Sequence, residues 1–142
     1  MTLPSFAAAR PSAVPAADPG YLPGVCNIGS AEIARRRRAG HVGLVATLGS
    51  FIVLVLIGAP PPARFLVAVP AAGAASGYLQ ARLRFCAGFG SRGIFNFGPL
   101  GQTEQVADDD ARARDRTQAI RIGLASLAFG ITVGVVAALL PR

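Results

Sequence analysis

Three long stretches of apolar residues dominate the pattern of the chain. They are Gly40–Ala59, Phe65–Ala81 and Ile122–Leu140, and each has about the 17–20 residues that a helix needs to cross a hydrocarbon core roughly 30 Å thick. The turn Pro60–Arg64 between the first two is too short and too rigid for anything except a hairpin. The pattern therefore predicts an all-α integral membrane protein with three transmembrane helices, an antiparallel hairpin followed by a third helix.

Composition agrees with this prediction. Hydrophobic residues make up 52% of the chain and charged residues only 15%, against roughly 25% charged in an ordinary soluble domain. All fourteen basic residues are arginines, which together with the richness in Ala, Gly and Pro points to a GC-rich bacterial genome. The net charge of +7 does not indicate nucleic-acid binding, because the arginines lie beside the apolar stretches, where the positive-inside rule places them.

The distribution of arginines predicts the orientation. The run Arg35–Arg38 precedes the first span, and seven arginines lie between the second and third spans, whereas Pro60–Arg64 and the C-terminus have one each. We therefore expect a multi-pass protein of the bacterial inner membrane, with the N-terminus and the long second loop in the cytoplasm and the C-terminus outside.

The chain divides into three parts. Residues 1–24 contain five prolines and no apolar periodicity, which predicts a disordered tail. Residues 25–98 form the membrane hairpin with its lead-in segment and an aromatic, Gly-rich loop, and residues 99–142 form a charged cytoplasmic segment leading into the third helix. A late signal sequence is the alternative for Arg35–Ala59, but the apolar run is long for a signal and a second span follows it.

The second loop has two halves. In Phe85–Gly101, glycines alternate with phenylalanines, which predicts no regular helix or strand but an aromatic loop in the membrane interface. A phosphate cradle near Arg92 is the weaker interpretation, because GxGxxG spacing is absent. In Asp108–Arg121 the three leading aspartates favour a helix start, and we expect i,i+4 pairs of Asp108 with Arg112 and of Asp110 with Arg114.

Small residues recur at four-residue spacing in the second and third spans. Gly73 and Gly77 form a GxxxG, and Ser126, Gly130 and Gly134 form a second stripe. Such stripes let helix backbones approach closely. They predict either packing within one chain, or homo-oligomerisation or docking against a partner in a membrane complex.

Cys26, Cys86 and His41 are the candidates for chemistry. The expected topology puts both cysteines at the cytoplasmic face and His41 at the membrane edge nearby. A thiol pair there can be redox-active, carry a persulfide or bind a soft metal. Without a CxxC, the competing interpretation is two buried small residues and an interfacial histidine. No catalytic residue, cofactor or metal site is assigned from the sequence.

One segment carries a family resemblance. Asn27-Ile28-Gly29 is followed by Glu32, Arg36 and Gly40, and Cys86-Ala87-Gly88-Phe89 follows the hairpin. This pattern resembles the YgaP-like two-helix inner-membrane domain family, with N-V-G-x-x-D-R-x-x-R-x-x-x-G at the start and C-P-x-Y near the end of the second span. Glu32, Ile33, Ala87 and Phe89 depart from it. The resemblance covers residues 26–89 and implies a membrane hairpin.

The same residues have a physical interpretation of their own. We expect Asn27 or Ser30 to cap the helix that leads into the first span, and Glu32 to reach Arg35 or Arg36. Gly29 permits the turn and Gly40 a close approach of helices.

These observations predict a non-enzymatic accessory or scaffold subunit that packs through its small residues. The alternative is a membrane protein that handles sulfur or a soft metal through Cys26 and Cys86. A transporter or pore is disfavoured, because the spans hold no ionisable residue except His41 at the edge.

Overall fold

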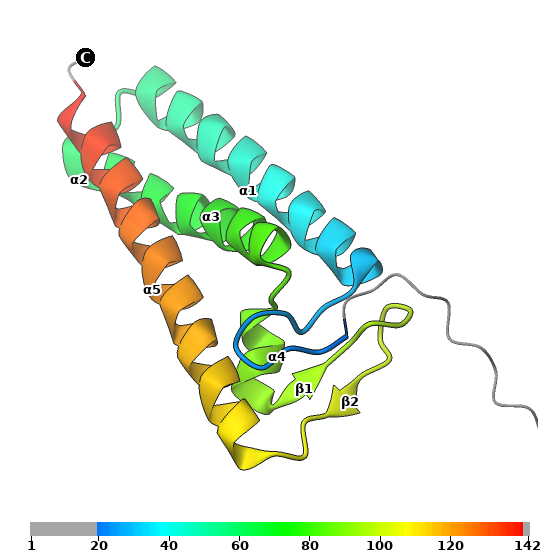
Figure 1. Ribbon diagram of the computed structural model, residues 1–142. Helices are drawn as coiled ribbons and strands as arrows, with labels where there is room; N and C mark the ends of the chain where they lie inside the picture. Colours follow the sequence, from blue (N-terminus) through cyan, green and yellow to red (C-terminus); the bar gives the residue numbers. More distant parts are fainter. Residues whose placement is uncertain (1–19, 141–142) are drawn as a thin grey trace, which may run out of the picture.

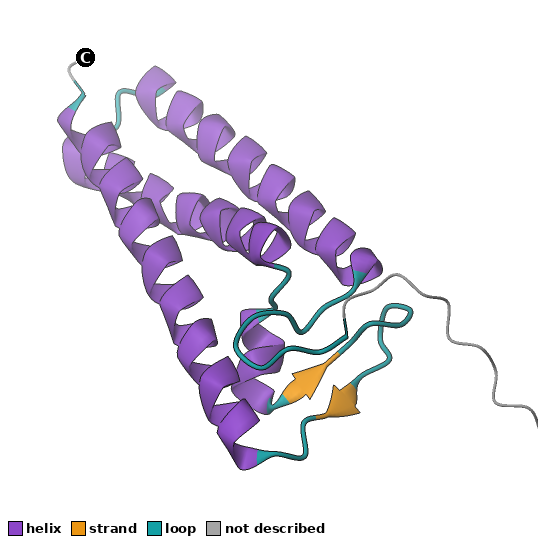
Figure 2. Ribbon diagram, in the orientation of Figure 1, coloured by secondary structure: helices purple, strands orange, loops and turns teal. Residues whose placement is uncertain are grey.

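The computed structural model describes residues 20–140 as a bundle of long helices with a small polar cap at one end (Figure 1). The bundle contains α1 (Ser30–Leu56), α2 (Pro61–Arg64), the 3₁₀ turn η1 (Phe65–Val67), α3 (Ala68–Leu83) and the C-terminal part of α5 (Asp109–Leu139). The cap contains residues 20–29, α4 (Ala87–Arg92), the strands β1 (Ile94–Phe95) and β2 (Glu104–Gln105), and the N-terminal turns of α5. Figure 2 shows the two strands, with the loops around them, as the non-helical part of the cap.

Local sequence explains where these helices begin and break. Asp108 caps α5, with its carboxylate accepting a hydrogen bond from the backbone N–H of Ala111 at 3.0 Å. Pro61 and Pro62 begin α2, where a missing N–H costs nothing. The ring of Pro70 conflicts with the carbonyl four residues earlier, and the chain is 3₁₀ rather than α-helical there, at Phe65–Val67.

The middle helix α3 packs against α1 on one side and α5 on the other. Small residues make both contacts possible. A Cβ added at Gly77 would overlap the backbone N of Gly40 and lie 2.7 Å from its Cα. One added at Gly130 would lie 2.5 Å from the carbonyl oxygen of Ala68. Backbone-to-backbone packing of this kind is how helices associate where lipid removes the hydrophobic driving force.

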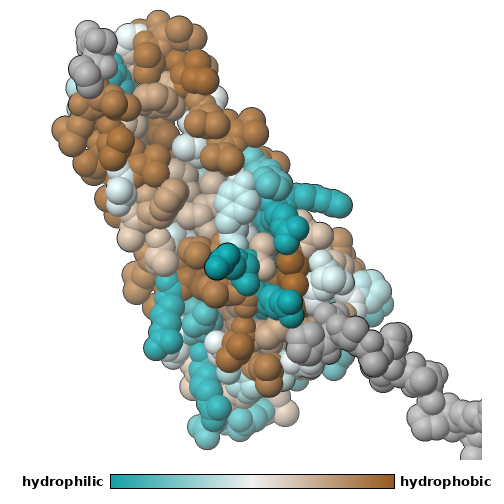
Figure 3. All heavy atoms as spheres, turned by 45° about the horizontal axis from the view of Figure 1, so that its top comes forward, coloured by the Kyte–Doolittle hydropathy of each residue, from teal (hydrophilic) through white to brown (hydrophobic). Residues whose placement is uncertain are grey.

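Two helices, α1 and α5, are long and apolar enough to cross a membrane. The expected second span falls on η1 and α3, and α3 has only 16 residues. At 1.5 Å per residue, the 31 residues of α5 extend about 46 Å, so its charged N-terminal part reaches well beyond the apolar region. Figure 3 shows hydrophobic residues gathered over the bundle end and hydrophilic ones toward the cap.

The aromatic loop is more ordered than the sequence suggested. Residues 87–92 form α4, and β1 pairs antiparallel with β2, Ile94 opposite Gln105. The prediction of no helix or strand was therefore wrong. Phe85 is fully buried against Ala119 and Ile122 of α5, so its apolar surface is satisfied by protein rather than by the membrane interface.

The N-terminal boundary also shifts. Residues 1–19 of the expected disordered tail lie outside the described residues, as do Pro141 and Arg142. Gly20–Gly24 belong to the cap: Tyr21 stacks on Phe95 with ring centroids 4.9 Å apart, and Leu22 pairs with Cys26.

Candidate functional site

Cys86 lies at the junction between the bundle and the cap. It is the residue before α4, and only 1% of it is exposed. Asn27, 59 positions earlier, holds its backbone in two directions: the Asn27 side chain accepts from the Cys86 N–H at 2.7 Å and donates to the Cys86 carbonyl at 3.1 Å. Gln80 completes the junction by accepting from the N–H of Ala87 at 3.0 Å.

A charged pair from α1 approaches the sulfur. Arg36 Nη2 donates to Cys86 Sγ at 2.8 Å and lies 3.8 Å from Glu32 Oε2. The guanidinium also lies 6.0 Å from the centre of the Phe89 ring. Glu32 is 1% exposed, and among residues 20–140 neither of its carboxylate oxygens accepts a hydrogen bond. Where α1 meets the cap, the buried carboxylate of Glu32, the guanidinium of Arg36 and the thiol of Cys86 therefore lie one after another in space.

The lead-in segment functions differently from the prediction. Gly29, not Asn27 or Ser30, is the residue that precedes α1, and no side chain caps the helix. Asn27 cannot cap α1 because its side chain is engaged with the Cys86 backbone, a tertiary contact invisible in local spacing. The expected pairing of Glu32 is confirmed, with Arg35 at 3.5 Å and Arg36 at 3.8 Å. Gly40 makes the predicted close approach, facing the Tyr78 ring and Gly77.

The other candidate residues are distributed differently. Cys26 is buried, its Sγ 3.9 Å from the Ile28 carbonyl oxygen, and neither cysteine is in a disulfide. His41 is exposed and its Nδ1 lies 2.6 Å from the Tyr78 hydroxyl, so its nearest polar partner is on α3 rather than at the thiols. No group of three His, Cys, Asp or Glu side chains within residues 20–140 is arranged to hold a metal ion.

The small-residue stripes are used mainly inside the chain. Gly77 faces α1, while Gly130 and Gly134 face the start of α3 and Phe65. Ser126 is buried and donates to the Ile122 carbonyl at 2.8 Å. Gly73 is the exception: it is exposed, and an added Cβ would meet nothing within 4 Å. Gly73 therefore does not pack against α1 or α5 within the chain, and its other predicted use, contact with a second copy or a membrane partner, stays a prediction.

A buried carboxylate in the cap was missed by sequence reasoning. Asp115 is fully buried and accepts hydrogen bonds from the Tyr21 hydroxyl at 2.8 Å and the Gly24 N–H at 2.6 Å. Burial, and next the hydrogen bond to Asp115, raise the pKa of Tyr21 above its usual value of 10.

The ion pair at the start of α5 differs from the predicted one. Asp109, rather than Asp108, pairs with Arg112, at 3.3 Å.

A buried arginine at the opposite end of the bundle was also missed. Arg64 is 2% exposed and donates to the carbonyl oxygens of Ala59 at 3.0 Å and Leu140 at 2.9 Å. It connects the hairpin turn to the C-terminus of α5, where a positive charge complements the helix dipole. The signal in the sequence was a lone arginine in an otherwise uncharged turn.

Comparison of the chain with protein-family models, with curated proteins and with solved structures gave no match. The functional argument therefore rests on the geometry described above.

Proposed function

We propose that the chain is a three-span protein of a bacterial inner membrane, with the cap in the cytoplasm, and that it acts as a non-enzymatic scaffold or accessory subunit. The second span, in addition to α1 and α5, is the helical path from Pro61 to Leu83, which comprises α2, η1 and α3. The arginines of the cap and of its border with the bundle support the orientation.

The open surface of α1 is the observation that carries the scaffold proposal. Only 11% of the most apolar stretch of this helix is buried, against 28% for α5. Its inner face is closed by Gly40 and Gly43 against α3, whereas Val42, Val45 and Gly49 are exposed. Most glycines of the stripes already pack within the chain. The outer face of α1 is therefore the surface that we propose for docking.

Membrane topology is the first test. The native thiols are buried, so they serve as a silent background for added cysteines. Ile57→Cys, at the exposed end of α1, should react with an impermeant maleimide on intact cells, and Ser91→Cys, on the cap, only after permeabilisation. Labelling of Ser91→Cys from outside contradicts the orientation, and release of the protein by alkaline carbonate contradicts membrane insertion.

The scaffold role is tested at the outer face of α1. Photo-cross-linkers at Val45 or Gly49 in intact membranes should give one discrete adduct with a second copy or another membrane protein. A cross-linker at Val69, which is exposed on α3, is the matched control. If the α1 positions give no more adduct than Val69, and the protein migrates as a monomer in native gels, the scaffold proposal fails.

A second candidate function is thiol chemistry at Cys86. The contact of Arg36 with the sulfur favours it, because a neighbouring guanidinium stabilises negative charge on sulfur. Cys86→Ser and Cys26→Ser separate the two proposals. A scaffold keeps its assembly and cellular phenotype in both variants, whereas a thiol protein loses its phenotype while remaining folded and inserted.

A further inference from the structure

Two hollows, one basic and one apolar, follow one another along one face of α5, and we call the pair the track. The basic half is a hollow of about 380 Å³ formed by Arg114, Thr117, Gln118 and Arg121 against Pro23 and Gly24. The apolar half is a hollow of about 420 Å³ whose lining includes Leu44, Ala75, Tyr78, Ala125 and Phe129. Arg121 and Ala125 are one helical turn apart, so the two halves share a face of α5. Each volume is within the roughly 300–1,000 Å³ of small-molecule sites.

Three arginines from three different helices lie toward the cap from the apolar hollow, about one or two turns beyond its lining residues on each helix. The Arg36 carbonyl borders Gly77, and Leu79 packs against the buried cluster of Phe85, Ala119 and Ile122. These contacts place Arg37 of α1, Arg82 of α3 and Arg121 of α5 at a similar level of the bundle.

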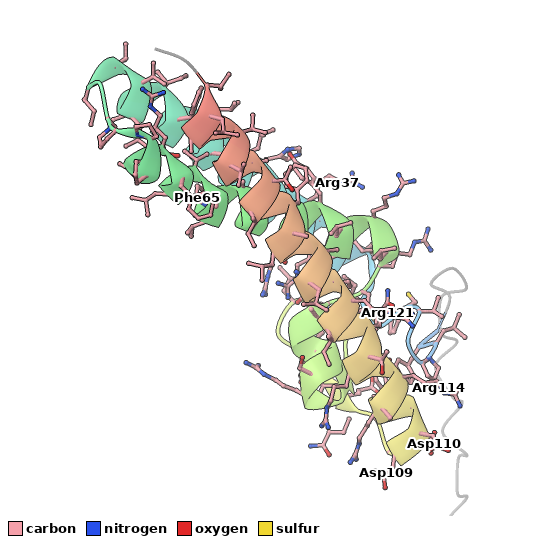
Figure 4. The ribbon with its side chains drawn as sticks, turned by 90° about the vertical axis from the view of Figure 1, so that its left-hand side faces the viewer. Arg37, Phe65, Asp109, Asp110, Arg114 and Arg121 are labelled. Carbon is pink, nitrogen blue, oxygen red and sulfur yellow. The ribbon has the colours of Figure 1, made fainter. Side chains whose placement is uncertain are left out.

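Helical spacing directs these arginines toward the track. Arg37 shares a stripe with His41, which contacts Tyr78, and with Leu44 in the apolar lining. Arg82 follows Ala75 and Tyr78 at the corresponding spacing on α3. Figure 4 shows Arg37, Arg114 and Arg121 on the same side of the molecule.

The positive charge of these three arginines is not neutralised by the protein. Arg37, Arg82 and Arg121 are exposed, and none forms an ion pair with an acidic side chain within residues 20–140. The two buried acidic groups nearby are engaged elsewhere: Glu32 pairs with Arg35 and Arg36, and Asp115 accepts a hydrogen bond from Tyr21. A ligand that satisfies the track needs an anionic group joined to an apolar chain.

We propose that the track binds one anionic phospholipid from the leaflet on the cap side, with its phosphate at Arg82 and Arg121 and one acyl chain along the apolar hollow. This inference rests on the proposed membrane insertion. A diester phosphate accepts hydrogen bonds from guanidinium groups, and each basic residue near a membrane surface contributes about 1 kcal/mol to anionic lipid binding. The bound lipid bridges α1, α3 and α5 at the border of the cap.

Native mass spectrometry of the delipidated protein in neutral detergent tests the proposal. Phosphatidylglycerol should bind at least about tenfold more tightly than phosphatidylcholine with the same acyl chains, since more than one arginine contributes about 1 kcal/mol. Arg121→Gln should weaken phosphatidylglycerol binding about fivefold. Arg116→Gln is the matched control, because Arg116 is exposed on α5 but does not line the track, and it should change binding by less than about twofold.

Ala125→Phe tests the apolar half without changing charge. Ala125 is exposed into the hollow, so the larger ring should displace the acyl chain while thermal unfolding stays unchanged. Inorganic phosphate at millimolar concentration should not displace the lipid. Equal binding of the two lipids, equal effects of the Arg121 and Arg116 changes, unaltered binding by Ala125→Phe, or displacement by phosphate each overturns the proposal. Carbonate extraction reports membrane insertion separately, so the two failures are distinguishable.

Discussion

Replacing Gly77 and Gly73 of α3 by alanine should have opposite effects on stability. Both changes occur in the same helix, so both gain the roughly 1 kcal/mol of helix propensity that separates alanine from glycine. At Gly73 the added methyl group meets nothing within 4 Å. Gly73→Ala should therefore leave the free energy of unfolding unchanged or raise it by up to about 1 kcal/mol.

At Gly77 the methyl group has no room. Its position lies 2.7 Å from the Cα of Gly40 and 2.9 Å from the carbonyl oxygen of Arg36, whereas carbon atoms in contact are separated by about 3.5–4.0 Å. Both neighbours are backbone atoms, so α1 must withdraw by about 1 Å. Overpacking of this kind costs about 1–3 kcal/mol. Because the propensity gain is common to both variants, Gly77→Ala should be less stable than Gly73→Ala by about that amount.

Reversible unfolding of the purified protein in mixed micelles, followed by far-UV circular dichroism across a series of SDS mole fractions, measures this difference. Withdrawal of α1 also opens the packing around Cys86, which is only 1% exposed, so the Gly77 variant alone should gain reactivity of Cys86 toward a maleimide. Equal stability of the two variants within about 0.5 kcal/mol, the scatter of ordinary surface substitutions, would refute the close α1–α3 contact.

Three further predictions concern the cap and the hairpin turn. Asn27→Ala leaves the buried N–H of Cys86 without its partner, whereas the Cys86 carbonyl keeps the N–H of Gly90. The change should cost about 1–3 kcal/mol, seen as faster hydrogen exchange of α4; unchanged protection contradicts the bridging role. The pKa of Tyr21 is raised in the fold, so the phenol stays protonated while the unfolded chain ionises, and cap stability should fall as pH rises above 10. Limited proteolysis at several pH values measures this loss of cap stability. Tyr21→Phe, which also removes the hydrogen bond to Asp115, should abolish the pH dependence; a dependence that survives points to another group. Arg64→Gln should lower stability by about 1–3 kcal/mol, because a buried carbonyl loses its charged donor, and should fray the C-terminus of α5 in exchange measurements; protection equal to that of the native protein contradicts the link.

Two segments that lie far apart in the sequence meet where α1 joins the cap. The segments around Asn27 and around Cys86 share hydrogen bonds, and Arg36 contacts the sulfur. Spacing along the chain brought these residues to attention, but it assigned Asn27 to the wrong partner. A capping role needs only neighbours in sequence, whereas the bridge to Cys86 requires the hairpin to return the chain to the same end of the bundle.

Hydrophobic runs, helix signals and charge determined the helical architecture from the sequence. Apolar runs of span length specify helices, because a helix satisfies its own backbone hydrogen bonds without water. Asp108 marks the start of α5 because its carboxylate accepts a hydrogen bond from the backbone N–H only three positions later. These are local properties, and the sequence states them directly.

Only the tertiary structure decided which side chains meet. Gly73 and Gly77 belong to one GxxxG, yet Gly77 touches α1 and Gly73 faces open space, because the rotation of α3 about its own axis is set by its two neighbours. Likewise Asp115 finds Tyr21, 94 positions away, and Arg64 finds Leu140, 76 positions away. Such pairings depend on how the helices are placed relative to one another, and no local pattern of residues carries that information.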